Sequence, residues 1–274
     1  MAYSFSSRVR YSEIGENGFL TLPGILNYFQ DCTTFQSEDI GLGMDSLKER
    51  KRIWVLSAWQ VIVKRYPALG ERIVTSTWPY GFRGFMGMRN FTMDTEDGER
   101  LACANTFWTF INGETGLPEK LKESDISGYQ MEEKLDMDYA PRKIVLPESF
   151  SAEEVFSVQK HHLDTNHHVN NSRYIQMAMD YVPAEFCIGQ MRAEYKQQAR
   201  LHDVIHPEKA ERTGRSQSFL MTRTAAHTRR WSFYRHKQNR RYLDYGQIVS
   251  EAMGGSIRRS GGRQSYGGNG TGGL

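Results

Sequence analysis

One short stretch, HHLDTNHHVNNSRY at residues 161–174, holds most of the residue types that could do chemistry. It contains four His, one Asp and three Asn, and it lies directly before a segment with a helical pattern. Asp164, Asn166 and His168 alternate along the chain, and alternate side chains of an extended segment point to one face. A carboxylate, an amide and an imidazole would then meet in one pocket.

Two other interpretations compete with a catalytic pocket. Zinc-binding histidines of proteases lie four residues apart on one helix, and structural zinc sites add Cys ligands. Neither pattern occurs here, so we predict no metal. The stretch could also be only a capped helix start with solvated histidines. The alternation of carboxylate, amide and imidazole favours the pocket.

The rest of the sequence offers no cofactor motif. It has no glycine-rich phosphate loop, flavin motif or Ser nucleophile elbow, so we expect no cofactor. The three cysteines, Cys32, Cys103 and Cys187, are too scattered for a disulfide framework and are expected to be reduced, buried thiols.

The order of elements indicates the fold. Residues 4–12 alternate like a strand, residues 22–41 show the three-and-four apolar spacing of a helix, and residues 54–112 read as three or four antiparallel strands. A curled sheet wrapped around one long helix is the hot-dog arrangement. Because residues 155–183 can be laid under 4–32, and 187–207 under 54–79, the chain reads as two copies of one unit.

These patterns predict an α+β protein of two tandem hot-dog units. The expected parts are an N-terminal unit at residues 1–113, a polar linker with one short helix at 114–150, a second unit at 151–212 that carries the polar site residues, and a basic tail at 213–274.

Charge and hydropathy restrict the location and the partners. The tail carries eleven of the 35 Lys and Arg residues but only two of the 32 acids, so residues 1–212 have a net charge of −6. No apolar run reaches the roughly 18 residues of a membrane span, and the N-terminal residues lack the pattern of a signal peptide. We therefore expect a cytoplasmic protein without membrane contact.

The segment LDTNHHVNNSRYIQMAMD resembles the signature of the plant and bacterial acyl-[acyl carrier protein] thioesterases, approximately Leu-Asp-x-Asn-x-His-Val-Asn-Asn-x-x-Tyr. The segments RAEYKQQARLHDVI and VRYSEIGENGFLTLPGILNYFQDCTTFQSEDIG resemble other parts of that family. The resemblance covers roughly residues 4–212 and implies hydrolysis of fatty acyl thioesters of acyl carrier protein, with release of free fatty acid.

The resemblance also implies a set of site residues. Glu194 would be the base for water, Asn166 and His168 would polarise or position the thioester and the water, and Asp164 would orient its neighbours. Some members have a Cys five positions after the Glu, where this chain has Ala199, so a cysteine nucleophile is not expected. His168 could itself be the base, and the sequence does not separate it from Glu194.

Thioester hydrolysis also needs donors for the oxygen that becomes negative, and room for the acyl chain. The helix start at Val169, Asn170 and Asn171 would present free backbone amides to that oxygen. The candidates for an apolar tunnel, each of which could also be ordinary core, are Ile25, Phe29, Trp54, Leu56, Trp59, Phe85, Phe107 and Trp108.

The implied partner is an acidic carrier protein bearing a fatty acyl-phosphopantetheine, so a basic surface should receive it. The best cluster is Lys48, Arg50, Lys51 and Arg52, followed by Lys64 and Arg65. Three alternatives stay open: a hot-dog acyl-CoA thioesterase, an inactive acyl-binding protein, and a nucleic-acid-binding protein that uses the basic tail. A monomer and a homodimer are equally compatible with the sequence.

From Thr213 the sequence stops following the hot-dog pattern, because Arg clusters and low-complexity Gly-rich segments replace the expected alternation. Reading the coding sequence one nucleotide earlier can give a turn and an alternating strand instead. We therefore hypothesise a frameshift near Gly214 to Ser216. The second unit as written would then lack its last strands.

Overall fold

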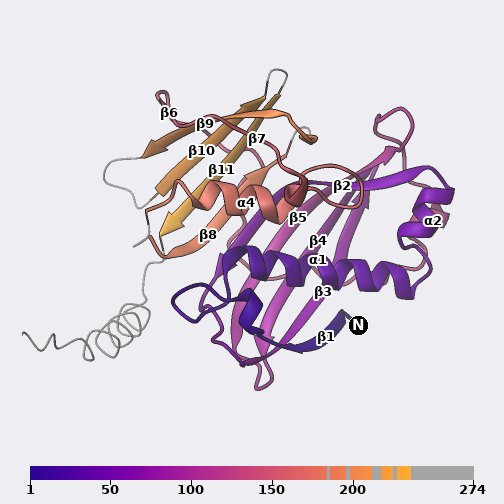
Figure 1. Cartoon of the computed structure of the whole chain (residues 1–274). Coiled ribbons are helices and arrows are strands. Elements are labelled where there is room, and N and C mark those ends of the chain that lie inside the picture. The colour runs from indigo at the N-terminus through magenta and orange to yellow at the C-terminus, as the bar shows by residue number, and fades with distance from the viewer. Residues whose placement is uncertain (184–185, 196–197, 212–216, 225–226, 236–274) are drawn as a thin grey trace, which may run out of the picture. The chain divides into compact units, whose positions relative to one another are not determined.

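The computed structural model describes residues 1–183, 186–195, 198–211, 217–224 and 227–235 (Figure 1). Within these ranges, 11 strands form one sheet, in the order β1-β3-β4-β5-β2-β8-β11-β10-β9-β6, with β7 paired to β9. All of the recorded pairings are antiparallel. No helix in the described ranges is long and apolar enough to cross a membrane.

The first half is a sheet of long strands that packs against one long helix. The sequence places its elements as β1 (Tyr3–Arg8), α1 (Leu22–Asp39), α2 (Met44–Glu49), β2 (Arg52–Val63), β3 (Arg72–Arg83), β4 (Met86–Thr95) and β5 (Arg100–Asn112). The Phe29 ring of α1 lies 6.1 Å from that of Trp59 on β2 and 5.2 Å from that of Phe91 on β4. Three aromatic rings therefore join the helix to the sheet, as the apolar spacing predicted.

The second half repeats this order with shorter elements. These are β6 (Ser151–Ala152), β7 (Phe156–Ser157), α4 (Asn171–Met179), β8 (Ile188–Glu194) and β9 (Val204–Glu211). The expectation of a long central helix in this half is wrong, since α4 has 9 residues against 18 in α1. Pro183 follows closely, and the residue before a proline disfavours the helical conformation, which explains the early end.

The sheet continues past the boundary that the sequence suggested at residue 212. Strands β10 (Gln217–Thr224) and β11 (His227–Arg235) pair with each other, and β11 also pairs with β8. Trp231 and Phe233 are 1% and 0% exposed, so this part of the expected tail belongs to the core. The hypothesised frameshift site, near Gly214 to Ser216, and the Gly-rich residues 236–274 lie outside the described residues.

The two halves share their sheet through β2 and β8. These strands pair in antiparallel register from Ala58–Glu194 to Ile62–Gln190. Because β8 continues to β11 on its other side, Trp59, Ala193 and Trp231 stand side by side across the join. The tandem units therefore form one continuous core rather than two separate domains.

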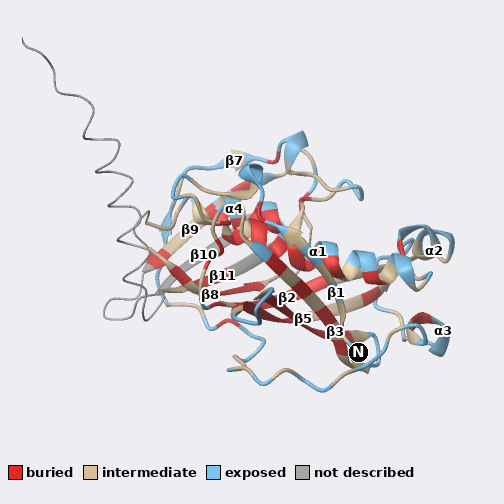
Figure 2. Cartoon of the chain, turned by 90° about the horizontal axis from the view of Figure 1, so that it is seen from below, coloured by how far each residue is buried: buried red, intermediate tan, exposed pale blue. Residues whose placement is uncertain are grey.

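The polar linker packs along the sheet as well as connecting the halves. It contains the short helix α3 (Glu123–Ile126), in agreement with the prediction of one short helix. Gln60 donates to the carbonyl oxygen of Asp138 (2.7 Å), and Arg192 donates to that of Lys143 (3.0 Å). Since Trp59, next to Gln60, faces α1, the linker covers the face opposite that helix (Figure 2).

Candidate active site

Asp164, Asn166 and His168 lie in a tight turn between the 3-10 turn Lys160–His162 and α4. The turn is closed by an antiparallel bridge between Leu163 and Val169, and the Asp164 amide donates to the His168 carbonyl oxygen (2.7 Å). The expectation of an extended segment is therefore wrong, although the three side chains still share one cavity. A turn, rather than strand alternation, brings them together.

The Asp164 carboxylate organises this turn. Its Oδ1 atom accepts hydrogen bonds from the backbone amides of Asn166 (2.8 Å) and His168 (3.2 Å). His167 takes a positive φ of 60°, a conformation that costs energy for a residue with a side chain. The carboxylate offsets that cost by satisfying two amides at once.

The first half contains the same turn without its chemistry. Ile14 and Leu20 form the equivalent bridge, and the Gly15 amide donates to the Phe19 carbonyl oxygen (2.9 Å). Gly18, with φ 77°, stands where the second half has His167. The two copies therefore share the backbone of this turn. Because Phe19 occupies the place of His168, only the second copy carries the polar site residues.

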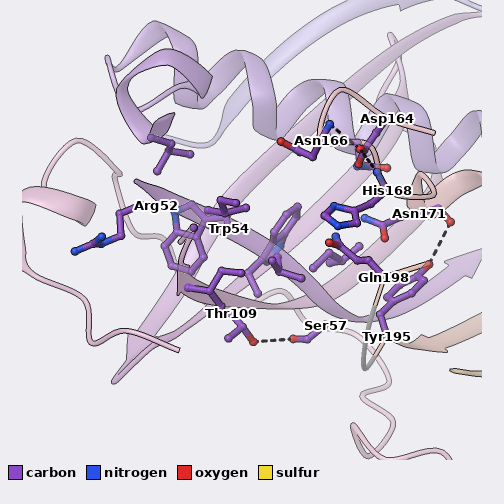
Figure 3. Close-up of a pocket in the computed structure, with 18 of the residues that line it drawn as sticks. Arg52, Trp54, Ser57, Thr109, Asp164, Asn166, His168, Asn171, Tyr195 and Gln198 are labelled. Atoms are coloured by element: carbon purple, nitrogen blue, oxygen red, sulfur yellow. Dashed lines mark hydrogen bonds between the residues drawn. The ribbon is translucent and has the colours of Figure 1, made fainter. Parts of the chain in front are cut away.

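A cavity of about 2110 Å³ joins this turn to the first half. Figure 3 shows His168, Asn171, Tyr195 and Gln198 gathered at one end of the cavity, with Trp54 and Arg52 towards the other. Asp164, Asn166 and Ser57 also line it. The polar residues of the second half thus meet where the turn, the start of α4 and the end of β8 come together, while polar residues of α1 and α2 line another side of the cavity.

His168 is half-buried in this cavity, and burial lowers the pKa of its imidazole below the ordinary value. The nearby Asp164 carboxylate acts in the opposite direction and raises that pKa, while Arg200 and His167 lower it further. The net shift is downward. The imidazole is therefore neutral near pH 7 and able to accept a proton.

Glu194 is not in the cavity. Its carboxylate accepts a hydrogen bond from the backbone amide of Ile144 in the linker (3.2 Å). Its neighbours on the strand, Ala193 and Tyr195, point to the helix-covered face, and Tyr195 lines the cavity. Strand alternation therefore places Glu194 on the opposite face of the sheet from His168.

Gln198 occupies the place near His168 where a carboxylate was expected. The segment that holds it is fixed beside the turn, since the Val169 amide donates to the Ala199 carbonyl oxygen (3.0 Å) and the Ala199 amide donates to Tyr174 Oη (2.7 Å). Sequence reasoning missed Gln198. Its position next to Ala199, in a segment that returns to the turn after β8 has ended, is the feature that could have indicated it.

The start of α4 offers fewer amides than expected. The Val169 amide is engaged with Ala199, and the Asn170 amide donates to the His162 carbonyl oxygen (2.9 Å). The Asn170 side chain caps the helix by accepting from the Ser172 amide (2.9 Å). Among the three expected donors, only the Asn171 amide has no acceptor within the described part of the chain.

The apolar wall of the cavity comes from the first half. Of the eight tunnel candidates, Trp54, Leu56 and Trp108 line it, together with Ile53, Phe82 and Met88. Ile25, Phe29 and Trp59 are at most 2% exposed and belong to the core, Phe85 is 43% exposed, and Phe107 contacts Arg142 of the linker. The cavity is therefore polar at the turn, and β2, β4 and β5 supply apolar side chains to its wall.

Most of the expected carrier-binding cluster is neutralised by acids. Arg50, Lys51 and Arg52 form ion pairs with Asp125, Glu114 and Glu119, and Arg65 pairs with Glu71 and Glu99. The remaining basic residues differ in where they lie. Lys48 lines the cavity, is exposed, and forms no ion pair with a described residue. Lys64 is exposed at the end of β2 and does not line the cavity. Exposed Arg142 and Arg200 also line the cavity, so the basic rim differs from the predicted one.

His161, His162 and Cys32 lie outside the cavity, whereas His202 and His206 line it. The His161 and His162 rings lie 4.1 Å apart, and His162 Nδ1 accepts from the Gln159 amide (3.0 Å). In the described ranges no three His, Cys, Asp or Glu side chains are grouped to hold a metal ion. Burial raises the pKa of the Cys32 thiol to about 12, which leaves it unreactive at neutral pH.

Two family models match the chain. The acyl-ACP thioesterase N-terminal domain matches residues 2–129, and the acyl-ACP thioesterase C-terminal domain matches residues 147–229. The chain is 26% identical over 237 residues to the chloroplastic acyl-[acyl-carrier-protein] hydrolase FATB1 of Cuphea viscosissima, which covers 78% of this chain and 56% of that protein. It is 27% identical over 215 residues to the chloroplastic palmitoyl-acyl carrier protein thioesterase of Arabidopsis thaliana, covering 72% and 52%. The chain spans about half the length of these relatives.

Solved structures of similar proteins share the fold. An acyl-ACP thioesterase from Bacteroides thetaiotaomicron superposes with a TM-score of 0.77 at 22% identity, covering 86% of this chain and 98% of that one. The 12:0-ACP thioesterase from Umbellularia californica gives a TM-score of 0.76 at 18% identity, covering 86% and 97%. These likenesses confirm the α+β class with two tandem hot-dog units. Together with the two family models, they show that the chain belongs to the acyl-ACP thioesterase family.

Proposed function

We propose that this protein hydrolyses fatty acyl thioesters of acyl carrier protein and releases free fatty acid. The observation that carries the proposal is a single cavity that is polar around His168 and that also has apolar side chains of β2, β4 and β5 along its wall. A thioester needs both parts, since its carbonyl group reacts while its acyl chain must leave water. Family membership supplies the substrate class.

In the proposed mechanism His168 is the general base. Its neutral imidazole takes a proton from a water molecule as the water oxygen attacks the thioester carbonyl carbon. The tetrahedral intermediate collapses by breaking the carbon–sulfur bond, and the imidazolium returns its proton to the leaving thiolate. The lowered pKa of His168 and its place in the cavity support this role, whereas the position of Glu194 on the opposite face of the sheet argues against Glu194.

The other polar residues position the reactants. The Asn171 amide, at the positive end of the α4 dipole, is suited to donate to the oxygen that becomes negative. Gln198 has an amide side chain that can hold the attacking water but cannot take its proton at neutral pH. Asp164 acts through the backbone by holding the amides of Asn166 and His168, and Asn166 offers a further amide at the exposed side of the cavity.

We propose that the carrier protein approaches the exposed rim where Lys48, Arg142 and Arg200 lie. None of these three forms an ion pair with a residue in the described part of the chain, so their charges are available to an acidic partner. The cytoplasmic location stays a prediction from the sequence. A monomer and a homodimer both stay open, and nucleic-acid binding by the basic tail stays the less favoured alternative.

The first experiment measures release of free thiol from acyl-carrier-protein thioesters of several chain lengths by the full chain. We expect turnover in the full chain and in Glu194→Gln, which keeps an acceptor for the Ile144 amide, and a large loss in His168→Gln. Loss of activity in a folded Glu194→Gln variant would return the role of base to Glu194. Absence of turnover at every chain length would reject the function.

The same assay with acyl-CoA thioesters tests the second candidate function. A carrier-protein enzyme should show a much higher kcat/KM for the carrier-bound substrate, and this advantage should fall with rising salt as rim charges are screened. Equal rates on both thioesters, with no salt dependence, would favour an acyl-CoA thioesterase. Acyl binding without turnover would favour the inactive alternative.

A further inference from the structure

Arg89, in the middle of β4, is a buried cation on the wall of the cavity. It is 6% exposed and lines the same cavity as His168. Its Nη1 atom donates to Gln36 Oε1 on α1 and to Thr77 Oγ1 on β3, the latter at 3.1 Å. The guanidinium carbon lies 5.3 Å from the centroid of the Tyr129 ring. These contacts orient the guanidinium group without neutralising it.

Arg89 has no carboxylate partner in the described part of the chain. It forms no ion pair with any Asp or Glu in the ranges that the structure describes. Burial lowers its pKa to about 10, so it still carries its charge near neutral pH. A buried charge without a counter-ion is costly, and an anion in the cavity would offset that cost.

One edge of the guanidinium is open. Neither Nε nor Nη2 donates to an acceptor within the described residues, where only Nη1 is engaged. Neither atom is among the fully buried polar atoms that lack a partner, so both keep some exposure, and Arg89 lines the cavity. The edge formed by Nε and Nη2 is a planar fork that matches the two oxygens of a carboxylate.

Arg89 lies well away from the polar end of the cavity. It pairs with Thr106 on β5, which in turn pairs with Trp59 on β2, so two strand spacings, about 10 Å, separate it from the strand that carries Ser57. Phe82, Met88 and Trp54 line the cavity in the same region. An acyl chain whose thioester lies at His168 would therefore bring its far part towards Arg89.

We propose that the cavity accepts acyl chains that carry a carboxylate at the end remote from the thioester, with that carboxylate bound by Arg89. The substrates would be monothioesters of dicarboxylic acids, hydrolysed by the reaction already proposed, on which this inference rests. Gln36 and Thr77 are positioning residues, because they hold Nη1 and leave the other edge of the guanidinium free.

The test compares carrier-protein substrates in matched pairs, such as octanoyl with octanedioyl, dodecanoyl with dodecanedioyl and hexadecanoyl with hexadecanedioyl. In the full chain, we expect at least one diacid thioester to exceed its monoacid partner in kcat/KM. In Arg89→Met, the ratio of diacid to monoacid should fall roughly 10-fold to 100-fold, as expected for a lost hydrogen bond to a charged group. Arg83→Met, which removes an exposed Arg outside the cavity, should leave the ratio unchanged.

The ratio of diacid to monoacid kcat/KM is measured within one protein. A merely structural role of Arg89 would therefore lower both values and leave their ratio unchanged. A folded Arg89→Met variant with the ratio of the original chain would overturn the inference. If Arg89→Met does not fold, thermal shifts of the full chain with dodecanedioate and dodecanoate decide: a larger shift with the diacid supports the inference and an equal or smaller one overturns it. These shifts do not depend on turnover, so they are distinguishable from failure of the proposed hydrolysis.

Discussion

At the scale of single residues, the proposed chemistry depends on a neutral imidazole. We expect His168→Gln to lower kcat by about 10²- to 10⁴-fold, the usual contribution of a positioned general base. The substitution keeps a polar side chain of similar size, so the thermal unfolding temperature should change little. The assay is thiol release from an acyl-carrier-protein thioester.

The matched control is His161→Gln, since His161 is exposed in the same segment and does not line the cavity. It should keep full activity. Equal loss in both variants would mean that the segment matters for folding rather than for proton transfer.

The pH dependence follows from the lowered pKa of His168. Above that pKa the imidazole is neutral and active, so kcat/KM should be level near pH 7 and should fall as the pH drops through the pKa. Because the Asp164 carboxylate raises the pKa, Asp164→Asn should move the fall to lower pH. The neutral amide keeps an acceptor for the amides of Asn166 and His168. A pH–rate profile that moves upward, or does not move, would contradict this assignment.

The sequence identified part of the site and misplaced the rest for a physical reason. Asp164, Asn166 and His168 are neighbours along the chain, so any tight turn brings them together. Glu194 and Gln198 are both near the end of β8, and the choice between them depends on where the strand ends and which face each side chain takes. The spacing of residues in the sequence does not determine where β8 ends or which face each of these side chains takes.

At the scale of elements, the internal duplication provides a matched pair of helix caps. Thr21 Oγ1 accepts from the Gly24 amide (3.1 Å) at the start of α1, and Asn170 Oδ1 accepts from the Ser172 amide (2.9 Å) at the start of α4. We expect Thr21→Ala and Asn170→Ala each to lower the free energy of unfolding by about 1 kcal/mol. Chemical denaturation measures both.

Activity should separate the two variants. Only the start of α4 lies in the cavity beside His168, so Asn170→Ala should also lower kcat, through displacement of the Asn171 amide. Thr21→Ala should leave kcat unchanged. If both variants keep full kcat, the start of α4 does not take part in the reaction.

The order of helix and strands in the first half was predictable because its apolar periodicity is strong. The length of α4, the single sheet and the strands beyond residue 212 were not. Sheet continuity depends on edge pairing between β2 and β8, which are about 130 residues apart in the sequence, and local patterns carry no record of such long-range pairing. In β11, the buried apolar residues Trp231 and Phe233 lie in a segment that is rich in Arg.

At the scale of the whole molecule, β11 supports the site through a chain of contacts. The Trp231 ring lies 6.0 Å from that of Tyr174 on α4, and Tyr174 Oη accepts from the Ala199 amide (2.7 Å) next to Gln198. The same Trp231 stands beside Ala193 of β8. Strand β11 therefore packs against the elements that hold Gln198 and Tyr195, although it lies beyond the boundary that the sequence suggested.

This support predicts different results for two substitutions of one residue. Trp231→Ala should lower the free energy of unfolding by about 3–5 kcal/mol, because it leaves a cavity between β11 and α4. Trp231→Phe keeps a ring against Tyr174, and Trp231 Nε1 has no hydrogen-bond partner among the described residues, so no hydrogen bond is lost. Trp231→Phe should therefore lower the free energy of unfolding much less and leave kcat close to that of the original chain.

Chemical denaturation measures the free energy of unfolding, and thiol release measures kcat. If Trp231→Ala were as stable and as active as Trp231→Phe, β11 would contribute little to the core, and the catalytic unit would end near residue 212 after all.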